Sequence, residues 1–176
     1  MVEKDLKKFQ DQTKLSTQNY LTAEAVAGEL LSLYEVDFAA WVDTQALLLE
    51  QGRYEELDEA NLIEEIRDLS RRERSALNNN LRIVLLHLLK WQFQSNRRSR
   101  SWKSSIVEHR QRIEQSLEES PSLKTYLENV FKDVYFKAVK KAEIETGLNR
   151  NTFPVDCPYT LAEILDVDFM PVETND

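Results

Sequence analysis

The feature that most constrains the fold is a long stretch with helical periodicity and no helix breaker. Between Asp58 and Trp91 the inward positions recur every three or four residues, and no glycine or proline interrupts them. This spacing places side chains on one face of an α-helix, and Asp58 is a suitable N-terminal cap. The sequence therefore predicts one long central helix with a buried stripe made of Leu62, Ile66, Leu69, Glu73, Ala76, Asn80, Leu81, Val84, Leu88 and Trp91.

Helix breakers are scarce in the rest of the chain as well. Three glycines and four prolines together make up about 4% of the 176 residues, whereas the average usage of these two residues together is about 12%. Sandwiches, barrels and doubly wound sheets need turn residues at short intervals, so the composition argues against them. The hydrophobic content of 41% is too high for a disordered chain. We therefore expect an all-α protein.

Two helices are expected before the long one. Thr22 can cap a short helix, and the next helix runs over about residues 37–51 with Asp37 as its N-cap. Gly52 then supplies the left-handed conformation that commonly ends a helix. Residues 1–20 are polar and weakly patterned, so we expect an N-terminal tail there.

Two more helices and a strap are expected after it. Residues 94–101 are polar and aperiodic and predict a loop, which the next helix follows. Ser120 and Pro121 predict the start of another helix, as its N-cap and first residue, and Gly147 predicts its end. Residues 149–158 contain two prolines and predict an irregular strap, and a capping box at 160–163 opens a short last helix. The predicted architecture is an antiparallel helical bundle with this C-terminal strap.

The expected organisation is a single helical domain over residues 21–171, with a C-terminal tail at 172–176. Cys157 is the only cysteine, which excludes an intrachain disulfide and a cysteine-based zinc site and fits a reducing compartment. The N-terminus lacks the apolar core of a signal peptide, and no apolar run approaches the ~20 residues of a membrane span. We expect a cytoplasmic protein with no membrane anchor and no cofactor.

Several local motifs match a known family. They read YEVDFAAW (34–41), GRYEELDEANLIEEI (52–66), HLLKWQFQ (87–94), RSRSW (98–102), PSL (121–123) and TFPVDCPYTL (152–161). Over roughly residues 34–171 the chain resembles the domain-of-unknown-function family number 29, which is common in cyanobacteria. The resemblance implies an all-helical fold and does not imply any reaction.

The acidic start of the long helix suggests a polar network. Asp58, Glu64 and Glu65 lie where the helix dipole favours carboxylates. In an antiparallel pair the start of this helix lies beside the end of the next one, so Arg110 is a better partner than Arg97. We expect a network of these five residues, with an arginine–carboxylate fork between Arg110 and Glu64 or Glu65.

Basic and aromatic residues are interleaved around the predicted loop. Twelve basic and three acidic residues lie between Arg67 and Arg112. Cations beside aromatic rings suit a phosphate backbone with stacked bases, so one hypothesis is nucleic-acid binding through residues 97–112. A second hypothesis is that the acidic stretches at 55–65 and 114–119 neutralise the segment inside the bundle, and a third is that an acidic protein binds it. The net charge of −8 disfavours nucleic-acid binding. The candidate patch is Lys90, Trp91, Arg97, Arg98, Arg100, Trp102 and Lys103.

No catalytic motif is present in the sequence. The two histidines, His87 and His109, could hold one zinc ion with Glu64 if they face each other, which is the basis of a metal-dependent hydrolase hypothesis. The Glu-x-x-His pattern of di-metal bundles is absent, since Val84 and Ile106 occupy the positions three residues before them. The sequence therefore favours a macromolecular-interaction or regulatory module without catalysis, with an unidentified protein as its partner.

Overall fold

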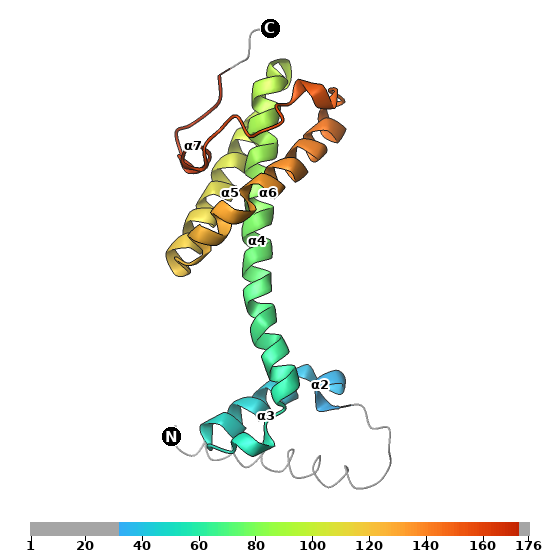
Figure 1. The fold of residues 1–176 in the computed structure, drawn as a ribbon, viewed down its shortest axis with the longest axis vertical. Coiled ribbons are helices and arrows are strands. Elements are labelled where there is room, and N and C mark those ends of the chain that lie inside the picture. The colour runs from blue at the N-terminus through green and yellow to red at the C-terminus, as the bar shows by residue number, and fades with distance from the viewer. Residues whose placement is uncertain (1–31, 173–176) are drawn as a thin grey trace. The chain divides into compact units, whose positions relative to one another are not determined.

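The computed structural model of the protein describes residues 32–172, and every regular element in this range is helical (Figure 1). The described part contains no strand, so the all-α prediction is confirmed. The helix expected after Thr22 and the tail over residues 1–20 lie outside the described residues. The elements are α2 (Leu33–Val36), α3 (Phe38–Glu50), η1 (Tyr54–Glu56), α4 (Glu59–Phe93), η2 (Ser95–Arg97), α5 (Arg100–Glu119), α6 (Leu123–Thr146), η3 (Arg150–Thr152) and α7 (Leu161–Leu165).

Local sequence signals set most helix boundaries. Asp37 caps α3 by accepting a hydrogen bond from the backbone of Ala40 at 3.0 Å. Thr160 and Glu163 form the predicted capping box of α7. Gly147 ends α6 with a φ of 72°, a left-handed conformation that glycine adopts at little cost. These boundaries are where the sequence placed them, because each depends on groups within one helical turn.

The start of α6 differs from the prediction. Ser120 was expected as its N-cap, but α6 begins at Leu123 and Ser120 instead closes α5. Ser120 has a φ of −135° and a ψ of 79°, in keeping with the bias away from helix for a residue before proline. Its carbonyl accepts a hydrogen bond from the Leu123 backbone at 2.9 Å, so Pro121 lies in a turn between the two helices.

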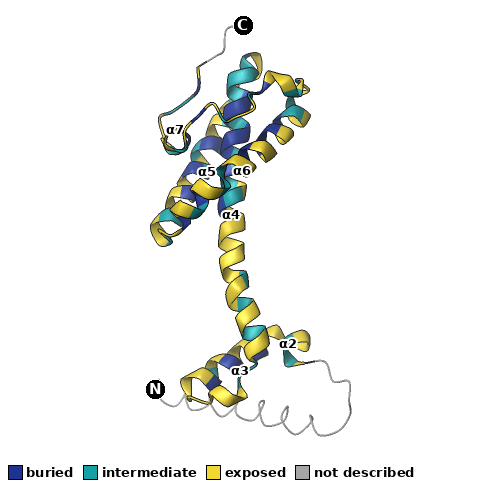
Figure 2. Ribbon diagram, viewed as in Figure 1, coloured by how far each residue is buried: buried dark blue, intermediate teal, exposed yellow. Residues whose placement is uncertain are grey.

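The contacts of the chain divide it into two compact units, with the boundary between Arg67 and Asp68 inside α4. The second unit is an antiparallel bundle of the later part of α4 with α5 and α6 (Figures 1 and 2). Its fully buried core comprises Leu77, Leu81, Val84, Leu85, Leu88, Leu89, Ile106, Ile113, Leu127, Ala138, Val139, Ala142 and Ile164. The single domain expected over residues 21–171 stays a prediction.

The predicted C-terminal strap is present in the second unit. Phe153 and Tyr159 are buried, and the rings of Phe153 and Phe93 pack edge to face at a centroid distance of 5.4 Å. The Tyr135 hydroxyl donates to the carbonyl of Pro154 at 2.8 Å. Two buried aromatic rings and a hydrogen bond therefore fix the strap to the bundle before α7 begins.

The first unit has a small core within residues 32–67. Trp41, Gln45 and Leu48 of α3 are its buried residues. The Trp41 indole donates to the Asp58 carboxylate at 3.1 Å, and Gln45 accepts the backbone N–H of Asp58 at 2.8 Å. These bonds tie the start of α4 to α3.

The stripe predicted along α4 is buried over only part of its length. Leu81 is fully buried, whereas Ile66 and Leu69 are 59% and 60% exposed, so the prediction was wrong for the early part of the helix. The reason is helix length. At about 1.5 Å per residue, the 35 residues of α4 span about 53 Å and the 20 residues of α5 about 30 Å. Periodicity identified the face, but α5 is too short to cover all of it.

Candidate functional site

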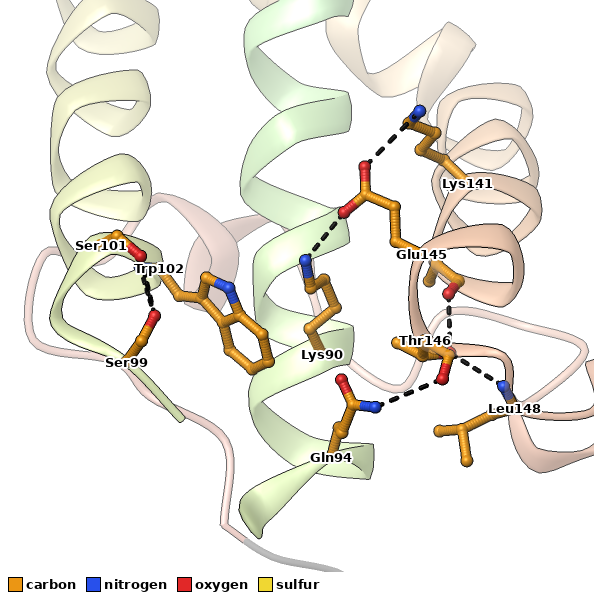
Figure 3. A network of polar contacts seen from close by, with 10 residues as sticks. Lys90, Gln94, Ser99, Ser101, Trp102, Lys141, Glu145, Thr146 and Leu148 are labelled. Carbon is orange, nitrogen blue, oxygen red and sulfur yellow. Dashed lines mark hydrogen bonds and ion pairs between the residues drawn. The ribbon is translucent and has the colours of Figure 1, made fainter. Parts of the chain in front are cut away.

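Three helices of the bundle meet around one buried cation, Lys90 of α4 (Figure 3). Its ammonium donates to the Glu145 carboxylate of α6 at 2.7 Å and lies 4.5 Å from the ring centroid of Trp102 in α5. The residue is only 8% exposed. The hydrogen bond from Lys90 is the main cause that lowers the pKa of Glu145. We call Lys90, Trp102 and Glu145 the Lys90 network.

The end of α6 is fastened to the same place. Glu145 also lies 3.5 Å from the ammonium of Lys141, so one carboxylate serves two cations. The side-chain amide of Gln94 donates to the backbone carbonyl of Thr146 at 3.3 Å (Figure 3). Carbonyls in the last helical turn lack intrahelical partners, and Gln94 supplies one. The Lys90 network therefore holds α4, α5 and α6 in register.

The candidate basic and aromatic patch separates into an internal and an exposed part. The Arg98 guanidinium lies 5.2 Å from the Trp91 ring centroid and donates to the Trp91 carbonyl at 2.9 Å. Lys90 occupies a face of Trp102 in the same way. One face of each tryptophan is thus taken by a cation of the protein itself, and a base stacked there would have to displace it. Lys90 is buried, whereas the exposed basic residues of the patch are Arg97, Arg98, Arg100 and Lys103.

Arg110 is an anchor for the backbone after α7. It is 4% exposed, and its guanidinium donates to the carbonyls of Ile164 at 2.6 Å, Phe169 at 2.9 Å and Val167 at 3.3 Å. Burial lowers the pKa of Arg110. The expected fork with a carboxylate is corrected by this geometry. Carbonyls at and beyond a helix C-terminus lack intrahelical donors, and this arginine supplies three.

Two other members of the expected polar network, Asp58 and Glu65, have hydrogen-bond partners within the first unit. Asp58 is bonded to α3 as described, and the Glu65 carboxylate accepts from the Tyr34 hydroxyl at 2.7 Å. Glu64 and Arg97 are exposed. The three acidic residues belong to the first unit and the two arginines to the second. A network that joins all five stays a prediction.

The two histidines lie in polar and aromatic surroundings. His109 Nδ1 is 2.7 Å from the side-chain oxygen of Asn80. The His87 ring lies 6.4 Å from Trp102, and its Nδ1 is buried without a hydrogen-bond partner in the described structure. Burial, followed by the charge of Lys90, lowers the pKa of His87 to about 4. Within residues 32–172 no three His, Cys, Asp or Glu side chains are grouped so that they could hold a metal ion.

An open groove between α4 and α6 was not anticipated from the sequence. Its volume is about 420 Å³, and we call it the basic groove. The sequence signal that could have found it is the spacing of its α6 residues, which follow one another at i, i+3, i+4 and i+7 like an ordinary apolar face. The two α4 residues that line the groove, Asn79 and Arg82, could not be found from the spacing of residues along α6. The lining residues are Asn79, Arg82, Lys137, Lys140, Lys141 and Ile144.

Comparison with known proteins gives a family and no function. A family model described as a domain of unknown function, DUF29, matches residues 33–170, which is most of the chain. No curated protein and no solved structure matches the chain. Among the described residues, no helix is long and apolar enough to cross a membrane. The match to the family model agrees in extent with the motifs between residues 34 and 171, and the chain therefore belongs to the DUF29 family.

Proposed function

We propose that the protein is a macromolecular-interaction module that binds a protein partner and does not catalyse a reaction. The observation that carries this proposal is the exposed apolar surface of the first unit. Helical spacing places Phe38, Val42 and Leu49 on one face of α3. Exposed apolar side chains that gather on one face commonly mark a docking site. The exposed large side chains there are Val36, Phe38, Val42, Leu49, Tyr54, Ile63 and Ile66.

The charge of the same unit indicates the chemistry of the partner surface. Residues 32–67 contain ten acidic and two basic residues, which gives −8 for this stretch. A partner that buries these apolar groups must also face this charge, and complementary charge gives specificity and speeds association. We propose a protein surface that combines lysine or arginine with apolar side chains.

The buried titratable groups of the second unit support a role without catalysis. Burial raises the pKa of the Cys157 thiol to about 11, which leaves it protonated and poorly nucleophilic at neutral pH. Burial and Lys90 keep His87 uncharged at that pH. The free thiol of Cys157 also fits a reducing compartment, and we propose a cytoplasmic location.

The test compares two variants that carry the same change of charge. Phe38→Asp/Ile66→Asp alters the apolar surface, and Gln111→Asp/Thr125→Asp places the same charges at exposed positions of the second unit. Tagged full-length proteins are incubated with nuclease-treated native lysate, and each retained protein is purified and its binding measured with two purified components.

We expect one partner whose affinity falls at least about tenfold with the first variant and less than about twofold with the second, since the loss of a central apolar contact costs more than ~1.4 kcal/mol. Equal retention by both variants, or no binding between the purified components, would contradict the proposal. Circular dichroism checks that both variants are folded.

A further inference from the structure

The basic groove concentrates positive charge on a protein whose net charge is −8. Lys137 and Lys140 are exposed, and neither forms an ion pair within the described residues. Arg82 donates to the side chain of Asn79 at 3.3 Å, a neutral partner that leaves its charge uncompensated. Lys141 shares Glu145 with Lys90, so its charge is compensated in part. The groove therefore presents an excess of cations to a ligand.

From this geometry we infer that the basic groove binds an acidic segment of a protein partner. It is a separate site from the apolar surface over residues 32–67 and does not rest on it. Charge complementarity selects carboxylate-bearing ligands, because unpaired lysine ammonium groups are donors without acceptors.

The dimensions of the groove favour a short peptide. Lys137 and Ile144 lie seven positions apart in α6, which is about 10 Å along the helix axis. An extended peptide covers that length with about three residues at ~3.3 Å each. The site therefore fits a few acidic side chains and is too short for a long polyanion to gain many contacts.

The lining of the groove favours protein over nucleic acid. Ile144 lines the groove, is 70% exposed, and offers contact to an aliphatic side chain next to the carboxylates. Within residues 32–172 no aromatic ring lines the groove, so unpaired bases have no described surface there on which to stack. A segment that mixes glutamate or aspartate with leucine-like residues matches both the cations and Ile144.

The experiment measures peptide binding to the full-length protein by fluorescence anisotropy at ~100 mM salt, where the Debye length is about 10 Å. The probe is a fluorescein-labelled twelve-residue peptide that repeats Glu-Glu-Leu. A peptide that repeats Gln-Gln-Leu and a labelled twelve-nucleotide oligo-dT are compared with it. The groove variant is Lys137→Glu/Lys140→Glu, and the control Lys124→Glu/Lys132→Glu makes the same change of charge at exposed lysines that do not line the groove.

We expect the acidic peptide to bind at least about tenfold more tightly than the Gln-Gln-Leu peptide and than oligo-dT. The groove variant should lose most of this affinity, and the control variant should change it by less than about twofold. Equal loss in both variants would mean that the peptide responds only to overall charge and would overturn the inference. Preferential binding of oligo-dT, or no binding of the acidic peptide to the wild type, would also overturn it. Lys137→Gln/Lys140→Gln repeats the comparison without charge reversal.

Discussion

Replacement of Arg110 by methionine should release the end of the chain from the bundle. The guanidinium donates to three carbonyls at and after α7, and the side chain is almost completely buried. Methionine keeps most of the apolar volume of the arginine and removes all of its donors. The substitution therefore isolates the hydrogen bonds from the packing.

The magnitude follows from the number and length of these bonds. A hydrogen bond from a charged donor contributes about 1.5–3 kcal/mol, and three that share one guanidinium do not add fully. The 3.3 Å bond to Val167 is the weakest, so the shorter bonds to Ile164 and Phe169 dominate. Removal of a buried charge also recovers part of its desolvation cost. We expect a net loss of about 3 kcal/mol in the free energy of unfolding.

Urea denaturation followed by circular dichroism measures this loss, and hydrogen exchange shows where it occurs. Protection should fall at the amides of Ile164 and Phe169, whose hydrogen bonds close the α7 turn and the turn after it. Arg110→Lys should give an intermediate loss, because one ammonium cannot reach three carbonyls. A methionine variant within about 1 kcal/mol of the wild type, with unchanged exchange, would refute the assignment of Arg110 as the anchor.

Three other predictions concern α4. Leu81→Ala, in the buried part of the stripe, should cost about 2–5 kcal/mol, whereas Leu69→Ala, in the exposed part, should change stability by less than about 0.5 kcal/mol; thermal melts that rank them equally would contradict the burial. Glu145→Gln should destabilise the protein more than Lys90→Met in urea titrations, because it leaves the Lys90 ammonium, whose side chain is 10% exposed, without its carboxylate. In the Lys90→Met variant, methionine keeps the contact with Trp102 and Glu145 stays paired with Lys141. The pKa of His87 is about 4 in the folded protein, below the 6.5 of an ordinary histidine, so its contribution to stability is complete above pH 6.5 and is lost as the pH falls towards 4. Partial exposure reduces that contribution to about 1–2 kcal/mol, and His87→Gln should flatten the stability profile over this pH range while His109→Asn changes it less.

The sequence by itself determined the features that depend on neighbours along the chain. The scarcity of glycine and proline indicated an all-α fold, and the caps at Asp37 and Thr160 and the stop at Gly147 were placed within about a residue. The motifs between residues 34 and 171 identified the family. These signals are local because a helix end is satisfied by groups within one turn of it.

Only the tertiary structure decided which charges and apolar groups lie inside. Periodicity assigned Leu69 and Leu81 to one stripe, but the lengths of the neighbouring helices left the first exposed and buried the second. Charge placed Arg110 opposite a carboxylate, but the chain returns after α7 and brings backbone carbonyls to it instead. The basic groove likewise needs Arg82 and Lys137, which are 55 positions apart. Burial and pairing of this kind depend on which helices meet in space, and a pattern along one helix does not contain that information.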